Sequence, residues 1–284
     1  MQHLTFPDGS TRPALGLGTW RMGESARTGG AEIAAVRLAL ELGYRVIDTA
    51  EMYGEGGAER VVGVALADAL RAGVVAREDV FVVSKVYPHN ASRRGVPAAC
   101  ERSRKRLGLD RIDLYLLHWR GAHPLGETVE AFEQLRARGH IGAWGVSNFD
   151  LEDMEELVGV PQGDACAADQ VYFSLGERGA GVALLPWLRA RGMPLMAYCP
   201  IDQGALAADT RLAAPAQRLG VSPAQLGLAW VLHQPGVMAI PKAVRETHLR
   251  ENRAAAELVL DEAVRHELDR LFPPPRARGP LAMV

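Results

Sequence analysis

The sequence lacks the features that mark membrane, exported and disulfide-bonded proteins. None of its 284 residues lies in a run that approaches the roughly 18 uninterrupted apolar residues of a membrane span. The N-terminus has neither the basic region nor the apolar core of an export signal. The three cysteines, Cys100, Cys166 and Cys199, are far apart and odd in number, which suits reduced thiols. We therefore expect a cytoplasmic protein that does not contact a membrane.

An excess of one charge is also lacking. The chain has 32 basic and 34 acidic residues, a net charge of -2, and no long block of either sign that could follow a phosphate backbone. Nucleic acid is therefore not an expected partner. No metal site is expected either, because His118 and His123 have no acidic or thiol partner at a ligand-like spacing.

A glycine-rich dinucleotide fingerprint after a strand is absent as well. The segment GEGGAE at 54–59 indicates only a turn. The sequence thus gives no support for an ordinary Rossmann site.

What the sequence does contain is a regular alternation of short apolar runs with helical stretches. The runs are 13–18, 44–50, 79–85, 112–118, 141–147, 167–172, 194–200 and 236–242. Their near-continuous hydrophobicity predicts parallel strands that are buried on both faces. Eight such units predict an α/β fold of the (β/α)8 TIM barrel type, which uses about 250 residues. Periodicity alone does not exclude an open doubly wound sheet.

Residues 3–14 precede the first of these units. HLTF and TRPA flank the turn residues PDGS at 7–10, which predicts an N-terminal β-hairpin that closes the barrel bottom. No linker or change of composition follows along the chain. We therefore expect residues 1–284 to form a single domain.

Four polar residues are predicted at one end of the barrel, where the strands finish. Asp48, Lys85 and His118 end three successive runs, and Tyr53 lies in the loop after Asp48. Reactive side chains of such barrels lie at these strand ends. We expect the Lys85 ammonium to lower the pKa of the Tyr53 phenol, and Asp48 to keep the lysine charged. Tyr53 then becomes a proton donor, while His118 polarises a carbonyl oxygen.

Each of these residues has a simpler explanation when it is considered alone. Asp48 and Lys85 could form a structural ion pair, and Tyr53 could be a packed surface aromatic. His118 could be a hydrogen-bonded histidine beside Trp119. The convergence of all four on one end of a barrel favours chemistry.

The motifs around these residues occur in a defined order. They are GLGTW, DTAEMYGE, VVSKVYP, LLHW, GVSNF, DQVYFSL, AYCP and IPKAVRETHLREN, from residue 16 to residue 252. In this order the sequence resembles the aldo/keto reductase superfamily over nearly its whole length. The segments HWRG and LLPW and the final MV are similar to the bacterial branch that includes methylglyoxal reductases.

The resemblance implies roles for individual residues. Asp48, Tyr53, Lys85 and His118 match the catalytic tetrad, with Tyr53 as general acid in reduction. It also implies a site for NADPH or NADP+, with NADH less favoured. The residues matched to that site are Gly18, Thr19, Trp20, Asp48, Ser147, Asn148, Gln170, Tyr198, Pro200, Ile201, Gln203, Gly204, Lys242, Ala243, Val244, His248, Glu251 and Asn252.

Two parts of the implied cofactor site depart from the family pattern. The loop that begins at Pro200 is short, which weakens the expected clamp on the pyrophosphate. Lys242, helped by Arg245, is expected to face the adenosine 2′-phosphate, but His248 stands where an arginine is common. A neutral histidine contributes less to a phosphate than arginine does, so the preference for NADPH is weakened.

The expected substrate is a small carbonyl compound, reduced by a monomeric enzyme. Trp20, Tyr53, Tyr87, His118 and Trp119 would form a cup around it, although Tyr87 could equally pack under the loops. Branch resemblance favours 2-oxoaldehydes such as methylglyoxal. One alternative is a cofactor-binding redox sensor or subunit with little turnover. Another is a sugar or diketo-acid reductase, which a basic residue facing the substrate would support.

Overall fold

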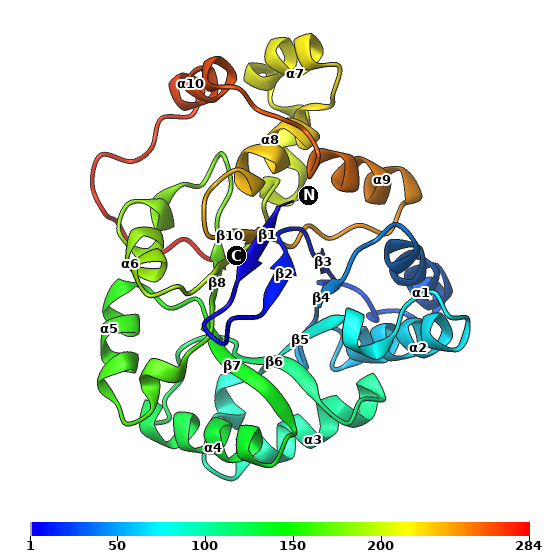
Figure 1. Ribbon diagram of the computed structural model, residues 1–284, viewed down its shortest axis with the longest axis vertical. Coiled ribbons are helices and arrows are strands. Elements are labelled where there is room, and N and C mark those ends of the chain that lie inside the picture. Colours follow the sequence, from blue (N-terminus) through cyan, green and yellow to red (C-terminus); the bar gives the residue numbers. More distant parts are fainter. Residues whose placement is uncertain (1) are drawn as a thin grey trace.

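The computed structural model describes residues 2–284 and shows a ring of eight parallel strands with helices around it (Figure 1). The strands are β3 (Leu17–Gly18), β4 (Val46–Asp48), β5 (Phe81–Val86), β6 (Ile112–Leu117), β7 (Ile141–Ser147), β8 (Asp169–Tyr172), β9 (Leu195–Tyr198) and β10 (Val237–Ala239). Each strand pairs with the next in chain order. Parallel bridges from Leu15 to Ala239 and from Gly18 to Lys242 join the two edges. The predicted (β/α)8 barrel is therefore confirmed.

Helices follow the strands and cover the outside of the ring. They are α1 (Ala26–Glu41), α2 (Gly57–Arg71), α3 (Gly95–Leu107), α4 (Leu125–Ala137), α5 (Leu151–Gly159), α6 (Leu184–Ala190), α7 (Ala213–Leu219), α8 (Pro223–Leu232), α9 (Glu246–Ala255) and α10 (Glu262–Leu271). Ser222 caps α8, with its side chain accepting the Gln225 N–H, and Pro223 lies in the first turn. The buried apolar residues of these helices, such as Val36 of α1 and Leu66 of α2, belong to one cluster with residues of the strands.

The strands are buried on both faces because they separate two apolar layers. Val46, Val83, Leu116 and Met196 belong to the layer that fills the barrel interior, while alternate strand residues pack against the helices in a second, larger cluster. This arrangement explains the near-continuous hydrophobicity of the strands.

A small antiparallel hairpin precedes the barrel. β1 (His3–Thr5) pairs with β2 (Thr11–Pro13), and Phe6 packs against Phe81 at the start of β5 with ring centroids 5.4 Å apart. Because Phe81 begins its strand, the hairpin lies at the N-terminal end of the barrel, as predicted. The opposite end, where Asp48 and Ser147 finish their strands, holds the predicted polar residues.

The helices among residues 2–284 cover the barrel, and their length and polarity bear on membrane contact. None of the helices there is both long enough and apolar enough to cross a bilayer.

Candidate active site

A buried ion pair lies at the C-terminal ends of β4 and β5. The Lys85 ammonium donates to Asp48 Oδ2 at 2.7 Å and to the Thr49 carbonyl at 2.9 Å, and the amide of Gln170 donates to Asp48 Oδ1 at 2.8 Å. Lys85 is fully buried. Burial lowers the pKa of Lys85, and the Asp48 carboxylate opposes that effect. Both oxygens of Asp48 are therefore held in place from two strands.

Tyr53 completes this group from the loop between β4 and α2. The Lys85 ammonium donates to the Tyr53 hydroxyl at 3.2 Å and lies 4.8 Å from the centre of its ring. The tyrosine thus contacts the ion pair directly, although it comes from a loop and its partners come from strands.

The expected direction of the Tyr53 pKa shift was wrong. Burial raises the pKa of this phenol well above its usual value of 10, and the Asp48 carboxylate raises it further. The physical reason is that a buried phenolate loses its hydration and lies near the Asp48 carboxylate, so the neutral phenol is favoured in the resting site. Tyr53 consequently keeps its proton at neutral pH, which is the state that a proton donor requires.

His118 lies next to Tyr53, directly after β6. The two rings are 5.7 Å apart, with the planes nearly perpendicular. Burial, followed by the charge of Lys85, holds the pKa of His118 well below 6.5. The imidazole is therefore neutral and can donate one hydrogen bond to a ligand.

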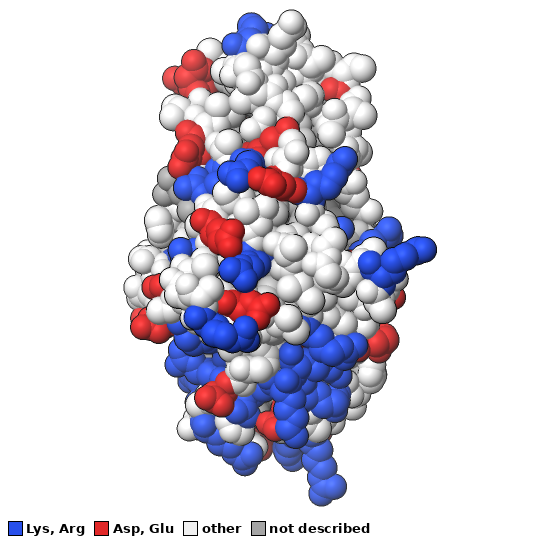
Figure 2. All heavy atoms as spheres, turned by 90° about the vertical axis from the view of Figure 1, so that its right-hand side faces the viewer, with Lys and Arg blue, Asp and Glu red and all other residues white. Residues whose placement is uncertain are grey.

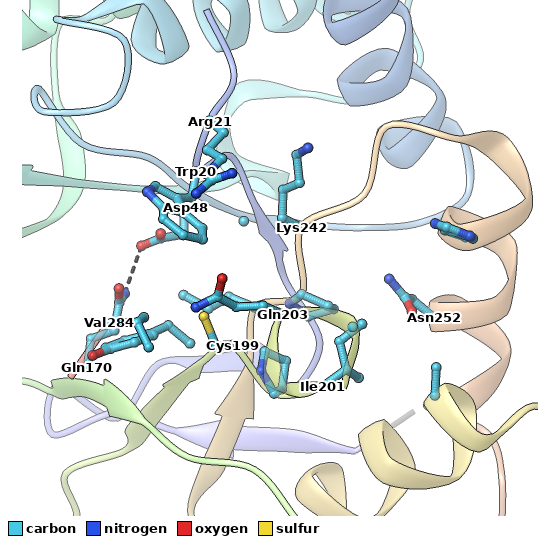
Figure 3. A pocket seen from close by; sticks show the side chains of 18 of the residues that line it. Trp20, Arg21, Asp48, Gln170, Cys199, Ile201, Gln203, Lys242, Asn252 and Val284 are labelled. Atoms are coloured by element: carbon cyan, nitrogen blue, oxygen red, sulfur yellow. Dashed lines mark hydrogen bonds between the residues drawn. The ribbon is translucent and has the colours of Figure 1, made fainter. Parts of the chain in front are cut away.

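Asp48, Tyr53 and His118 line a cavity of about 880 Å³ at the open end of the barrel. A volume of this size lies within the usual range for small-molecule and cofactor sites, roughly 300 to 1,000 Å³. Most of the predicted site residues line it, namely Gly18, Trp20, Asp48, Tyr53, His118, Trp119, Ser147, Asn148, Gln170, Tyr198, Pro200, Ile201, Gln203, Gly204, Lys242, His248, Glu251 and Asn252. Figure 3 shows Asp48 and Gln170 at one end and Asn252 at the other.

The remaining predicted residues lie outside the cavity lining. Lys85 acts from behind Asp48, and Thr19 is buried with its hydroxyl donating to the Asp48 carbonyl. Ala243 and Val244 belong to the segment after Lys242 without lining the cavity. Tyr87 packs edge-on against Trp119, with its hydroxyl donating to Glu55.

Several lining residues were not predicted. They are Arg21, Met52, Cys199, Ala207, Ser222, Pro223, Ala224, Ile240, Pro241, Met283 and Val284. Arg245, which was expected to help Lys242, also lines the cavity. Met283 and Val284 have no local sequence signal, because they reach the cavity from the far end of the chain. Val284 lies near Gln170 and Cys199 (Figure 3). Arg21 follows Trp20 directly, and only its position in the fold shows that it faces the cavity.

A chain of polar groups extends from the ion pair along the cavity wall. Ser147 donates its hydroxyl proton to the Gln170 carbonyl at 2.7 Å. Asn148, in the left-handed region with φ 59°, donates to the His118 carbonyl at 3.1 Å. Tyr198 donates to the Asn148 side-chain oxygen at 2.8 Å. These bonds, with the one from Gln170 to Asp48, fix the side-chain amides of Asn148 and Gln170, two of the residues matched to the cofactor site.

Away from the ion pair, the cavity lining includes two basic side chains together with the carboxylate of Glu251. The basic side chains are Lys242 and Arg245, and neither has a carboxylate within 4 Å among residues 2–284. Arg245 Nη2 lies 2.9 Å from His248 Nε2. The histidine can accept this hydrogen bond only when it is neutral at that nitrogen, so it holds the guanidinium in place.

The arrangement was then compared with known proteins. Residues 14–272 match the model of the aldo/keto reductase family. The methylglyoxal reductase YeaE of Escherichia coli is 46% identical, with 99% of this chain and 98% of that protein covered. Glyoxal reductase of Bacillus subtilis is 34% identical over 93% of this chain and 90% of its own length.

Solved structures agree with these sequence relationships. An aldo/keto reductase from Klebsiella pneumoniae, crystallised with NADP and acetate, is 46% identical with a TM-score of 0.94, covering 99% of each chain. A second structure of a Klebsiella pneumoniae aldo-keto reductase, with NADPH, has a TM-score of 0.93 at the same identity and covers both chains fully. By its sequence, its barrel and its match to these relatives, the chain belongs to the aldo/keto reductase family.

Proposed function

We propose that this protein is an NADPH-dependent reductase of small aldehydes, with 2-oxoaldehydes such as methylglyoxal as the favoured class and Tyr53 as proton donor. The observation that carries the proposal is the 3.2 Å contact between the Lys85 ammonium and the Tyr53 hydroxyl at the edge of the cavity. Relatives that act on methylglyoxal and glyoxal support the substrate class.

The cavity residues fit a nicotinamide dinucleotide. The hydrogen-bonded amides of Asn148 and Gln170 suit the amide of a nicotinamide ring. The cations of Lys242 and Arg245, elsewhere in the lining, suit the phosphate groups of the dinucleotide. Two relatives at 46% identity are bound to NADP and NADPH. When bound, the reduced nicotinamide supplies a hydride to the carbonyl carbon.

The residues of this chain would then complete the reduction. The neutral His118 donates a hydrogen bond to the carbonyl oxygen and orients it. As negative charge develops on that oxygen, Tyr53 transfers its phenolic proton to it, and the product is the alcohol. The Lys85 ammonium, 3.2 Å from the phenol oxygen, stabilises the phenolate that remains. The high pKa of the resting phenol prevents early loss of that proton.

The cavity wall near Tyr53 suits a small substrate. Trp20, Met52 and Trp119 line it together with Met283 and Val284, so that bulky apolar side chains narrow the space. Such a wall offers few groups that recognise a large polar substrate.

The proposal is tested by the oxidation of NADPH with methylglyoxal, followed at 340 nm, for wild type and Tyr53→Phe. Loss of a general acid lowers kcat about 10²- to 10⁴-fold. The variant removes one hydroxyl, so NADPH binding and the unfolding midpoint should change little. Retention of turnover by Tyr53→Phe would refute the role of this residue. Tight NADPH binding by wild type without turnover on any carbonyl would favour the sensor alternative.

A second candidate is a reductase of carbonyl compounds that bear a carboxylate. The observation in its favour is Arg21, a basic residue in the cavity lining whose guanidinium lies 4.6 Å from the centre of the Trp20 ring. Methylglyoxal and glyoxylate, compared at equal concentration, separate the two candidates. A higher kcat/KM for glyoxylate that Arg21→Gln abolishes would support the second.

A further inference from the structure

Two buried glutamates flank Tyr53 along the chain, and neither contacts the cavity. Glu51 is 5% exposed and Glu59 is completely buried. A carboxylate that is removed from water costs free energy unless it is paired and hydrogen-bonded. The hydrogen-bond partners of these two side chains therefore indicate their role.

Glu51 connects the start of the Tyr53 loop to the segment after Lys85. Its Oε1 accepts the Tyr87 backbone N–H at 2.8 Å and the Asn90 amide at 3.0 Å. Its Oε2 accepts from Arg102 of α3 at 3.2 Å. Both carboxylate oxygens are thus used by groups outside the loop.

Glu59 makes the corresponding connection after the loop, in the first turn of α2. Its Oε1 accepts the Ser84 hydroxyl at 2.6 Å, and its Oε2 accepts from Arg106 of α3 at 2.8 Å. Ser84 directly precedes Lys85 in β5. The two glutamates therefore bind β5 and its extension on either side of the lysine that contacts Tyr53.

The loop itself needs such support. Gly54, Glu55 and Gly56 follow Tyr53 with φ of 56°, 49° and 78°, and left-handed backbone is costly for a residue other than glycine. The support comes from α3, whose basic side chains contribute to the positive surface in the lower part of Figure 2. Arg102 and Arg106 reach from this helix to the buried carboxylates.

We propose that Glu51 and Glu59 are positioning residues that set the separation of the Tyr53 hydroxyl and the Lys85 ammonium. The inference rests on the proposed role of Tyr53 as proton donor. Each glutamate joins one flank of the tyrosine to one flank of the lysine, and an arginine of α3 neutralises it. Proton donation depends on sub-ångström placement, and a shift of about 1 Å can cost 10²-fold in rate.

A purely structural role would make the same contacts, so a matched control is required. Asp113 provides one at the other end of β5, where its carboxylate accepts the Val82 N–H at 2.8 Å and pairs with Arg77 at 2.8 Å. It is 8% exposed. Asp113→Asn therefore removes a comparable buried charge from the neighbouring strand β6, which contacts the start of β5 and not the end that holds Lys85.

The test compares Glu51→Gln, Glu59→Gln and Asp113→Asn with wild type. We expect the two glutamine variants to lose about tenfold or more in kcat while the Kd for NADPH stays within about twofold. The deuterium isotope effect on kcat with 4-deuterated NADPH should rise, because the chemical step becomes slower. Asp113→Asn should lower the unfolding midpoint and leave kcat and the isotope effect unchanged.

A pH profile gives a further readout for Glu59. The charged or titratable groups that face Lys85 are Asp48, Tyr53, Glu59 and His118. The Glu59 carboxylate raises the pKa of Lys85, so Glu59→Gln should lower it. The alkaline loss of kcat should therefore begin at a lower pH than in wild type, whereas Asp113→Asn should leave it in place.

The outcomes separate this inference from the proposed function. If Tyr53→Phe is inactive but both glutamine variants match wild type, the positioning inference fails alone. Equal losses of kcat in all three carboxylate variants would indicate a structural role and overturn it. If Glu59→Gln does not fold, Arg106→Gln breaks the same contact from the less buried side. Should wild type show no turnover, crystal structures still decide, because an unchanged separation of Tyr53 and Lys85 in the variants would refute the inference.

Discussion

The two ends of the cavity differ in how they are held together. At the catalytic end, Asp48 and Lys85 are buried and bonded to each other, to Gln170 and to Tyr53. At the opposite end, Lys242 is exposed, and it has no carboxylate within 4 Å in the described part of the chain. One end is organised by the protein itself, while the other depends on a ligand to neutralise its charge.

The difference has a physical basis in desolvation. A buried ion pair is costly to form, and it is strongly destabilising to break because one charge is left without a partner. An exposed cation loses little when it has no partner, since water and salt screen it. The side chains near Tyr53 are therefore held in place because they are buried, whereas the exposed Lys242 side chain can move to meet a ligand.

The largest effect is expected when the buried end is broken. Lys85→Met leaves the Asp48 carboxylate uncompensated and should lower the free energy of unfolding by about 3 to 5 kcal/mol, measured in urea, with loss of turnover. The double variant Asp48→Asn with Lys85→Met should regain much of the stability without activity. A single variant as stable as wild type would contradict the importance of the pair.

The next effect concerns the exposed end. Lys242→Ala should weaken NADPH binding about 10- to 100-fold, as expected for a charged hydrogen bond of about 1.5 to 3 kcal/mol, and should hardly affect NADH. Fluorescence titration with both nucleotides measures this. Arg250→Ala is the control, because Arg250 of α9, the helix that follows Lys242, already pairs with Glu246. Equal losses of affinity for both nucleotides would contradict a contact between Lys242 and the 2′-phosphate.

A smaller effect concerns His118 and pH. Its folded pKa lies well below 6.5 because of burial, so below pH 6.5 the unfolded chain takes up a proton that the folded protein does not. Stability should fall with falling pH by about 1.4 kcal/mol per unit below 6.5. His118→Asn should lack this loss between pH 7.5 and 5.0 in urea unfolding. Parallel curves for the two proteins would mean that the folded histidine is protonated.

The smallest effect is that of salt. Raising NaCl from 0.05 to 0.5 M should weaken NADPH binding several-fold, because the exposed cations are screened. At saturating NADPH, kcat should be nearly constant, since the buried pair is shielded from ions. A large fall in kcat with salt would show that the catalytic end is more open than the structure indicates.

Prediction from sequence succeeded where a local pattern decides the outcome. Apolar runs located the strands, the turn residues 7–10 located the hairpin, and strand ends located Asp48 and Lys85. The variants proposed above test whether each site residue has the role that the resemblance implies. The sequence could not show the sign of the Tyr53 pKa shift, because the shift depends first on how deeply the phenol is buried and then on its distance from the Asp48 carboxylate.

Other features could not be predicted because they depend on contacts between residues that are far apart in the sequence. Met283 reaches the cavity from the far end of the chain, which no periodicity reveals. Tyr87 lies outside the cavity lining and donates a hydrogen bond from its hydroxyl to Glu55, a contact that the sequence does not reveal. Nothing in the sequence distinguishes Glu51 and Glu59 from other carboxylates of loops and helices. Their importance follows only from their partners near β5 and on α3.

The hairpin at the barrel bottom has a practical consequence for handling the molecule. Its turn at residues 7–10 projects from the face opposite the cavity, and Gly9, with φ of 80°, has no neighbouring atom near its Cβ position. A cysteine introduced at the exposed Asp8 would let the protein be attached covalently to a bead or an electrode. Molecules fixed in this way would all present the barrel mouth to the surrounding solution.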